Sequence, residues 1–268
     1  MASQPTLVKL AAATCLALPI TAHAFFPFIT DDTGTQGRGG NQIELNYEFV
    51  KEHNDEVDLE GRVIGSATSV ASVMPATYTY GLTDDLDIFV GVARQLNPTR
   101  GWLNSEVGLK WVAFGDQSRG WSAALKPTLL IPVTSQMQQR GLGNARTNAG
   151  LTLVGSYVAD THELHFNLGY QSNQLGNSPE LEPQRHDLWQ VSAAPIYVIN
   201  EQWKAGIDVG LASNPTYDSQ YQAFGQVGLQ YAPIENLQIG IGIIGTKPIN
   251  SAQNGWSMAL TTGLAYQF

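Results

Sequence analysis

The stretch GWSMALTTGLAYQF, residues 255–268, alternates apolar side chains with small or polar ones. In an extended strand, successive side chains point to opposite faces. One face therefore carries Trp256, Leu260 and Phe268, while the other is small and polar. The end of a soluble domain's chain rarely carries an unbroken apolar stripe. A strand with lipid on one side and a water-filled lumen on the other requires one. The stretch predicts a membrane-spanning β-strand.

The same alternation with a period of two recurs in segments between residue 42 and this last stretch. It predicts strands at about 42–49, 66–80, 86–92, 107–113, 121–133, 151–157, 164–170, 187–199, 203–211, 220–231, 237–243 and 255–268. Connections after the even-numbered strands are short, and most of the others are longer and more polar. Bacterial outer-membrane barrels combine an even strand count with short periplasmic turns and longer outer loops.

The predicted fold is therefore all-β: a transmembrane, antiparallel, up-and-down β-barrel of about 12 strands in the bacterial outer membrane. A closed barrel satisfies every backbone donor and leaves no strand edge in lipid. Closure requires the region 43–49 to pair with the region 256–268, with both ends of the barrel chain on the periplasmic side. Pro127 and Pro132 lack the ladder donor, so each implies a bulge or a local break. The strand register stays open at these two prolines and at Pro195.

The first 24 residues have the pattern of a signal peptide. Lys9 supplies a positive charge, residues 10–18 an apolar core and Ala22-His23-Ala24 a cleavage site, so the mature chain is expected to start at Phe25. The apolar run is shorter than the roughly 20 residues that a spanning helix needs, which disfavours a retained anchor. The only cysteine, Cys15, lies in this segment. Residues 25–268 therefore have no thiol for a disulfide or a metal.

Residues 25–40, FFPFITDDTGTQGRGG, carry no period and are rich in Gly, Asp and Thr. We interpret them as a periplasmic lead-in, or as a plug inside the barrel, which then comprises residues 41–268. The formal net charge is −9 without basic clusters, which argues against a nucleic-acid partner. Mean hydropathy of −0.12 excludes only helical membrane proteins, because a barrel alternates lipid-facing and lumen-facing residues. Outer-membrane lipids and a small-molecule solute are the expected partners.

Three stretches carry a family resemblance: ITDDTGTQG at 29–37, YGLTDDLD at 80–87 and the terminal YQF at 266–268. With the strand at 42–49, they resemble the bacterial outer-membrane transporter family named after the meta-cleavage pathway of phenol degradation. The resemblance implies a 12-stranded barrel that passes small, aromatic or hydrophobic molecules. It also implies that the outer-membrane assembly machinery reads Phe268.

Ionisable residues on the predicted inner faces are the main functional candidates. A Lys or Arg facing lipid near the bilayer midplane costs about 2–4 kcal/mol, so the period of two assigns charges to the lumen. They either form ion pairs that fill the interior or line a permeation path and set its selectivity. Phe89 and Phe224 also face inward and either contact an apolar solute or fill the lumen. The predicted lumen-lining residues are Glu44, Glu48, Asp87, Phe89, Glu106, Lys110, Lys126, Glu163, His165, Lys204, Asp208 and Phe224.

The sequence contains no nucleophile elbow, HExxH motif or phosphate-binding glycine loop. His162 and His165 are three residues apart, so in a strand they point to opposite faces and do not chelate one ion. We expect no enzymatic activity, no cofactor and no metal. The leading hypothesis is a channel or passive transporter. The alternatives are a structural barrel with a filled lumen, an outer-membrane lipid hydrolase, which needs a lipid-facing serine beside a histidine, and a soluble periplasmic binding module.

Overall fold

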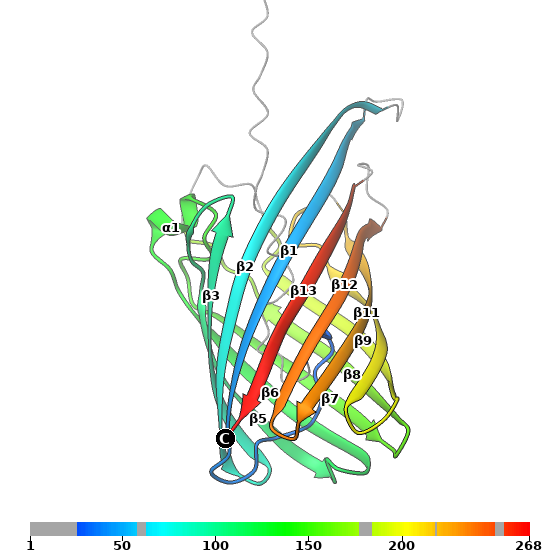
Figure 1. The fold of residues 1–268 in the computed structure, drawn as a ribbon. Coiled ribbons are helices and arrows are strands. Elements are labelled where there is room, and N and C mark those ends of the chain that lie inside the picture. Colours follow the sequence, from blue (N-terminus) through cyan, green and yellow to red (C-terminus); the bar gives the residue numbers. More distant parts are fainter. Residues whose placement is uncertain (1–25, 58–62, 177–183, 218, 250–254) are drawn as a thin grey trace, which may run out of the picture.

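The computed structural model describes residues 26–57, 63–176, 184–217, 219–249 and 255–268. The predicted signal peptide lies outside the described residues, as do the tips of three of the predicted loops. Every long element in the described part is a β-strand (Figure 1). The strands are β1 (Asn41–Val57), β2 (Val63–Thr83), β3 (Leu86–Asn97), β4 (Gly101–Trp102), β5 (Ser105–Gly115), β6 (Gly120–Ile131), β7 (Asn148–Val158), β8 (His162–Ser172), β9 (Asp187–Val198), β10 (Trp203–Ser213), β11 (Tyr221–Ile234), β12 (Leu237–Ile249) and β13 (Gly255–Gln267).

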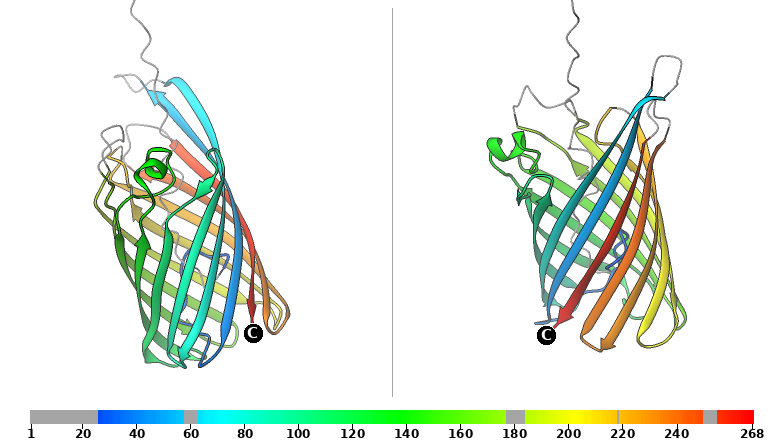
Figure 2. Two further views of the ribbon diagram at one scale, coloured as in Figure 1. Left: turned by 90° about the vertical axis from the view of Figure 1, so that its left-hand side faces the viewer. Right: turned by 45° about the horizontal axis from the view of Figure 1, so that its top comes forward.

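The strands form one closed antiparallel barrel (Figures 1 and 2). β4 is a two-residue strand that pairs only with β3, and the other strands form the 12-stranded wall that the sequence predicts. Neighbours in the wall are neighbours in the chain, except at the seam where β1 pairs with β13. At this seam Leu45 pairs with Leu264 and Phe49 with Leu260. The predicted pairing of the two ends is therefore confirmed.

Burial alternates along each strand as the period of two requires. In β3, Asp87 and Phe89 are buried, whereas Val90 between Phe89 and Gly91 is 48% exposed. Leu, Ile and Val side chains are exposed on every wall strand, which gives the barrel an apolar outer belt of the kind that contacts lipid. No helix in the described residues is long and apolar enough to cross a membrane.

Aromatic side chains gather toward the two ends of the wall. Trp203 stacks on Tyr231 with ring centroids 4.3 Å apart, beside the short turns. Trp189 packs against Tyr221 at 5.2 Å, where β9 and β11 leave the long connections. Such rings prefer the headgroup level of a bilayer because they have an apolar body and a polar edge. The two groups mark the two membrane interfaces.

The prolines interrupt the ladder without shifting it. The pairing of β5 with β6 steps from Gly108 opposite Thr128 to Trp111 opposite Leu125 and keeps its register past Pro127. β9 and β10 likewise keep their register past Pro195. Pro132 comes directly after the last residue of β6. The expected local break is therefore present at Pro127, and the one register shift of this ladder lies elsewhere, between Val112 and Phe114.

The sequence predicts that the first strand ends at about residue 49, which is wrong, because β1 continues to Val57. Lys51 lies in β1 and pairs with both Val70 and Met258. Backbone hydrogen bonds hold a strand whatever its side chains are, and beyond the membrane a polar side chain meets water on either face. β1 and β2 therefore rise above the rest of the wall (Figure 2).

The connections are unequal at the two ends. Short turns join β2 to β3, β5 to β6, β7 to β8, β9 to β10 and β11 to β12. At the other end, the connection between β6 and β7 spans residues 132–147 and contains helix α1 (Ser135–Gln139), capped by the Thr134 side chain, which accepts from the Met137 N–H. The sequence predicts this connection as a loop but not its helical turn.

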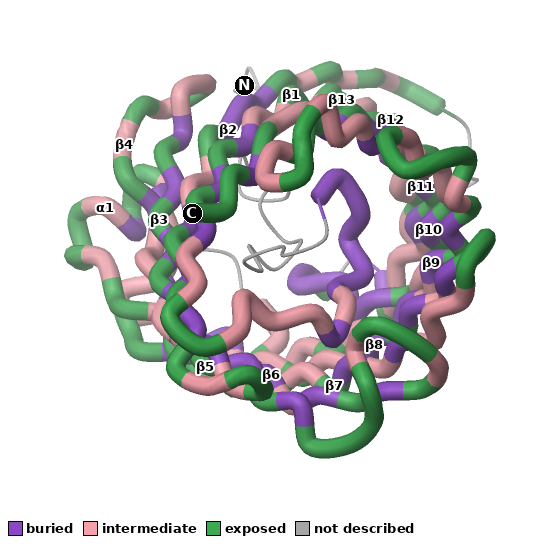
Figure 3. Tube along the Cα trace, turned by 60° about the horizontal axis from the view of Figure 1, so that its bottom comes forward, coloured by how far each residue is buried: buried purple, intermediate pink, exposed green. Residues whose placement is uncertain are grey.

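Residues 26–40 do not extend away from the barrel. They run inside it, where most of residues 26–33 are buried (Figure 3). Residues 37–40 then return to the wall, where the Gly39 N–H donates to the Gly81 carbonyl at 2.8 Å. We refer to residues 26–40 as the lead-in segment.

Candidate functional site

The lead-in segment is attached to the wall by its own backbone. The N–H groups of Thr30, Thr33 and Gln36 donate to three different strands. Thr30 donates to the Asp208 carboxylate at 2.6 Å, and Gln36 donates to both oxygens of Asp87 at 3.0 and 3.2 Å. Thr33 donates to the Ser156 hydroxyl at 3.0 Å. A segment without secondary structure must satisfy its donors elsewhere, and here the inner wall supplies the acceptors.

Apolar contacts hold the front of the lead-in segment. Phe28 is 1% exposed and packs with Ala194 and Ile196. The wall beside it is glycine: a Cβ at Gly228 would lie 2.7 Å from the Phe28 ring. A Cβ at Gly240 would likewise lie 2.6 Å from the Phe26 ring. Small inward residues on β10 to β12 therefore make the room that the phenylalanines fill.

A second apolar contact joins Ile29 to residues of β11, β12 and β13. Ile29 packs with Phe224, Ile244 and Ala259. Phe224 is thus a neighbour of the lead-in segment and is 4% exposed. Phe89 is also buried, under the Lys126 ammonium, which lies 5.1 Å from its ring centroid.

Asp31 forms the most concentrated charge contact in the lumen. Its Oδ2 lies 2.5 Å from the Lys126 Nζ and its Oδ1 lies 3.2 Å from the Lys110 Nζ. The three side chains are almost fully buried. Lys110 also donates to the carbonyls of Asp32 and Gly34, at 3.1 and 2.9 Å. Removing one partner of such a buried pair costs about 3–5 kcal/mol because it leaves a charge uncompensated.

A separate polar chain lies along the wall on β7, β8 and β10. The Lys204 Nζ donates to Glu163 at 2.8 Å, and the other Glu163 oxygen lies 3.4 Å from the His165 Nε2. The His165 Nδ1 lies 2.8 Å from the Ser156 hydroxyl, which also accepts from Thr33. His162, three residues before His165, is exposed on the outer face, as the period of two predicts.

Ser156, His165 and Glu163 have the composition of a hydrolase triad, but not its setting. In serine hydrolases the acid holds Nδ1 and the serine faces Nε2, which is the reverse of the order here. Ser156 is 1% exposed and faces the lumen, whereas a lipid hydrolase needs a lipid-facing serine. β7 and β8 pair Ser156 directly with His165, but on the inner face, so this pair is not the lipid-facing serine beside a histidine that the hydrolase alternative needs. Ser156 accepts from the Thr33 N–H and so links this group to the lead-in segment.

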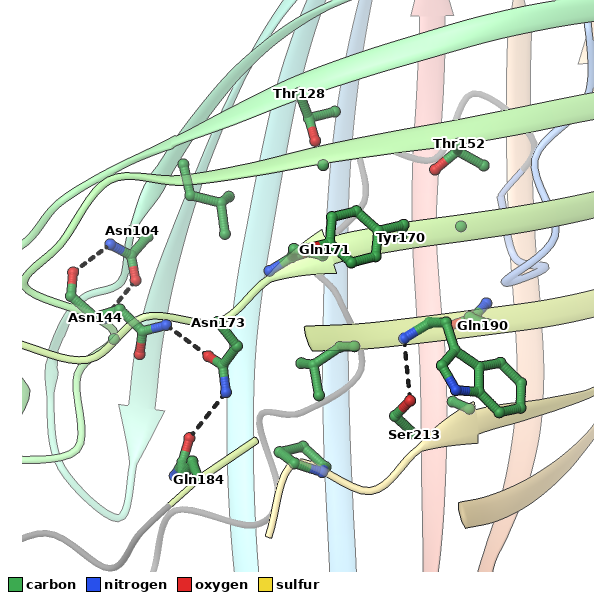
Figure 4. Close-up of a pocket in the computed structure, with 18 of the residues that line it drawn as sticks. Asn104, Thr128, Asn144, Thr152, Tyr170, Gln171, Asn173, Gln184, Gln190 and Ser213 are labelled. Carbon is green, nitrogen blue, oxygen red and sulfur yellow. Dashed lines mark hydrogen bonds between the residues drawn. The ribbon is translucent and has the colours of Figure 1, made fainter. Parts of the chain in front are cut away.

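A cavity of about 200 Å³ occupies the part of the lumen toward the long connections (Figure 4). Its floor includes Ile29 and Asp31 of the lead-in segment, and Lys126 reaches it from β6. Leucines, side-chain amides, threonines and glycines are among the other residues that line it. A chain of amide contacts runs along one side: Asn144 donates to Asn173 at 2.8 Å, and Asn173 donates to Gln184 at 3.2 Å. Its lining includes none of the three triad-like residues.

The burial pattern places each predicted lumen residue on the inner face, with Glu48 and Lys204 half-buried and the rest buried. The structure divides them into groups rather than one site. Lys110, Lys126, Asp87 and Asp208 contact the lead-in segment. Glu163, His165 and Lys204 form the polar chain, and Glu44 accepts from Gln42 at 2.5 Å. Their role in selectivity stays a prediction.

Sequence reasoning missed the residues of the lead-in segment that make these contacts. Thr30, Asp31 and Thr33 lie in a stretch whose sequence has no period of two. That period is the signal that assigns a residue to one face of a strand. A usable signal was the run Thr-Asp-Asp-Thr itself, because it supplies acceptors to a lumen that holds lysines. In the described residues, no three His, Cys, Asp or Glu side chains gather as metal ligands would.

Phe268 continues the hydrogen-bond ladder between β1 and β13 and does not point into the lumen. Its N–H donates to the Asn41 carbonyl at 2.9 Å, and its carbonyl accepts from the Asn41 N–H at 3.1 Å. Its ring stacks on Tyr266 and is 60% exposed. Recognition by the assembly machinery stays a prediction.

Comparison with known proteins shows the fold. No protein-family model matches the chain, and no curated protein sequence does. Among solved structures, the NanC porin is 11% identical, with 82% of this chain and 98% of that chain covered and a TM-score of 0.54. The KdgM porin in complex with disordered oligogalacturonate is 10% identical, with 84% and 99% covered and a TM-score of 0.53. The chain is therefore a closed 12-stranded barrel with the fold of outer-membrane porins.

Proposed function

We propose that this protein is an outer-membrane channel for the passive passage of small molecules, with the lead-in segment as a plug. The observation that carries the proposal is the cavity of about 200 Å³ inside the barrel, which Ile29 and Asp31 of the lead-in segment line together with residues of the wall. The apolar outer belt, which is typical of a barrel in lipid, and the porin fold support a place in the outer membrane. The mechanism is diffusion, and no covalent step is involved.

The plug is held by contacts that can break and re-form. Hydrogen bonds from Thr30, Thr33 and Gln36 and the Asp31 ion pairs join it to the wall. A solute enters between the long connections, occupies the cavity and passes when the segment shifts. Motions of this kind occur on the microsecond to millisecond scale.

The solutes we propose are small molecules with an aromatic or hydrophobic body. Leu103, Leu130 and Leu188 line the cavity together with neutral amides, so it offers apolar contact and a few polar partners, as ligand pockets do. The resemblance of residues 29–37 and 80–87 to the phenol-degradation transporter family supports the same class of solute.

Planar-bilayer recording of the refolded protein tests the proposal. We compare the chain that starts at Phe25 with a variant lacking residues 26–40. Rare openings of the first and steady conductance of the second are expected. A matched assay compares the rate of benzyl alcohol uptake into proteoliposomes with that into protein-free liposomes, because this alcohol also crosses lipid unaided, and uptake here means the rate above that background. Two silent barrels without uptake would refute the channel function.

A structural barrel with a filled lumen is the second candidate. It is favoured by the apolar clusters that occupy parts of the interior, such as Val112 with Ala124 and Val154. In that case the cavity is a packing defect. The variant lacking residues 26–40 then still has no conductance, although it folds and runs in its heat-modifiable position on a gel.

A further inference from the structure

Two lysines from neighbouring strands meet on one carboxylate. Lys110 of β5 contacts one oxygen of Asp31, and Lys126 of β6 contacts the other. Two ammonium groups that share the two oxygens of a carboxylate form charge-assisted hydrogen bonds, which are about twice as strong as neutral ones. The carboxylate, however, belongs to the lead-in segment and not to the wall. The lysines are fixed on strands, and the group that they bind is on a segment without secondary structure.

Nearby carboxylates of the wall have donors of their own. Asp87 accepts two hydrogen bonds from the Gln36 N–H, and Glu44 accepts from the Gln42 side chain. Asp31 is therefore the carboxylate on which both lysines converge. The Lys110 Nζ also lies 3.4 Å from the Asp32 Oδ1 of the same segment. If the Asp31 carboxylate left, each lysine would lose an ion pair of 3.2 Å or less, and another carboxylate in the same place would restore both.

The cavity reaches this pair. Asp31 and Lys126 both line it, and Thr128 and Thr152 lie beside them on the wall. Leucines, side-chain amides and glycines are among the other residues that line the cavity. A molecule in the cavity that has an apolar body and one negative end would place that end against Lys126, where the Asp31 carboxylate now lies.

We propose that Lys110 and Lys126 are a binding site for the carboxylate of a small monocarboxylate solute with an apolar or aromatic body. Asp31 occupies this site in the plugged state, and the solute replaces it. Exchange of one carboxylate for another keeps the two ion pairs that Asp31 makes, whereas a neutral solute replaces neither of them. This inference rests on the proposed channel function and narrows its solute class.

Calorimetric titration of the refolded mature chain in detergent tests the site. The probes are benzoate and benzamide, which are similar in size and differ in charge. Benzoate is expected to bind about tenfold or more tightly than benzamide, because a hydrogen bond to a charged group contributes about 1.5–3 kcal/mol. Equal affinity for the two probes in the unmodified chain would overturn the proposal without any variant.

Two substitutions sharpen the test. Asp31→Asn removes the internal competitor, so benzoate affinity rises several-fold while benzamide affinity does not. Lys126→Met lowers benzoate affinity about tenfold. The matched control is Lys247→Met, at an exposed lysine of β12, which leaves the affinity unchanged. Heat-modifiable mobility on a gel confirms that each variant is folded. Equal benzoate affinity of Lys126→Met and Lys247→Met would overturn the site.

Failure of this inference is distinguishable from failure of the channel function. Liposome swelling with benzyl alcohol measures passage without a carboxylate. Swelling that occurs while benzoate and benzamide bind equally well contradicts the carboxylate site and leaves the channel standing. Charge-dependent binding without any swelling or benzoate uptake contradicts the channel, although the lysine site itself is then real.

Discussion

At the scale of single residues, Gly228 shows how the wall accommodates the lead-in segment. Its Cα faces Phe28 with no side chain between them, and an added Cβ would lie 2.7 Å from the ring. We expect Gly228→Ala to weaken the docking of the segment by about 1–3 kcal/mol through overpacking. Amide hydrogen exchange of residues 26–36 should then be roughly five- to a hundredfold faster, since exchange follows the population of the open state.

The matched control is Gly225→Ala, three residues earlier on the same strand, where an added Cβ meets nothing within 4 Å. Exchange of the lead-in segment should be unchanged in this variant. Equal exchange in the two variants would show that the contact with Phe28 does not hold the segment.

The same scale shows what the sequence does and does not predict. The alternation along β5 and β6 places Lys110 and Lys126 in the lumen, because a charge on the other face would meet lipid. It does not identify Asp31 as their partner, since Asp31 belongs to a stretch without a period, 79 residues from Lys110 along the chain. A contact between a strand and an irregular segment has no sequence signature of its own, whereas the face of a strand residue does.

At the scale of elements, the seam between β1 and β13 determines whether the barrel is closed. Leu45 and Leu264 are directly opposite in this pair, on the outer face. Directly opposed residues have Cα atoms about 4.5–5.5 Å apart, within the range of a disulfide. We expect Leu45→Cys with Leu264→Cys to form an intramolecular disulfide on oxidation, detected by mass spectrometry of the linked peptides.

Leu45→Cys with Leu260→Cys is the out-of-register control. Leu260 pairs with Phe49, four residues along the strand, which is about 13 Å from Leu45. No bridge is expected. A bridge in this control but not in the paired variant would mean that the register of the seam is wrong.

The outer belt makes a second prediction about elements. Ile241 lies near the middle of β12 and is 48% exposed. Ile241→Arg should lower the free energy of unfolding from phospholipid vesicles by about 2–4 kcal/mol, because arginine is placed near the bilayer midplane. Denaturant titration measures this change.

The comparison position is Ile234, which ends β11 beside the turn at residues 235–236 and is 56% exposed. Arginine near an interface costs only about 0–1 kcal/mol. If Ile241→Arg and Ile234→Arg cost the same, the apolar belt does not span a bilayer as proposed.

At the scale of the whole molecule, the number and order of strands are the most predictable features. Each wall strand has one lipid-facing and one lumen-facing side, so each repeats the same pattern, and the connections between them are polar. β1 and β2 extend further than the sequence predicts at the end of the long connections. Beyond the membrane neither face of a strand has to be apolar, so the period of two stops before the strand does. The sequence also does not decide whether residues 25–40 fill the lumen, since a plug and a lead-in outside the barrel have the same composition.

The unequal connections give the molecule an orientation, and this can be measured. Ser118 lies in the short turn between β5 and β6, and Ser135 begins α1 in the long connection between β6 and β7; both are exposed. Short turns are periplasmic and long loops extracellular in outer-membrane barrels. In intact cells, a membrane-impermeant maleimide should label Ser135→Cys and leave Ser118→Cys unlabelled, while both label after permeabilisation. Labelling of Ser118→Cys alone in intact cells would reverse the orientation and place the cavity on the periplasmic side.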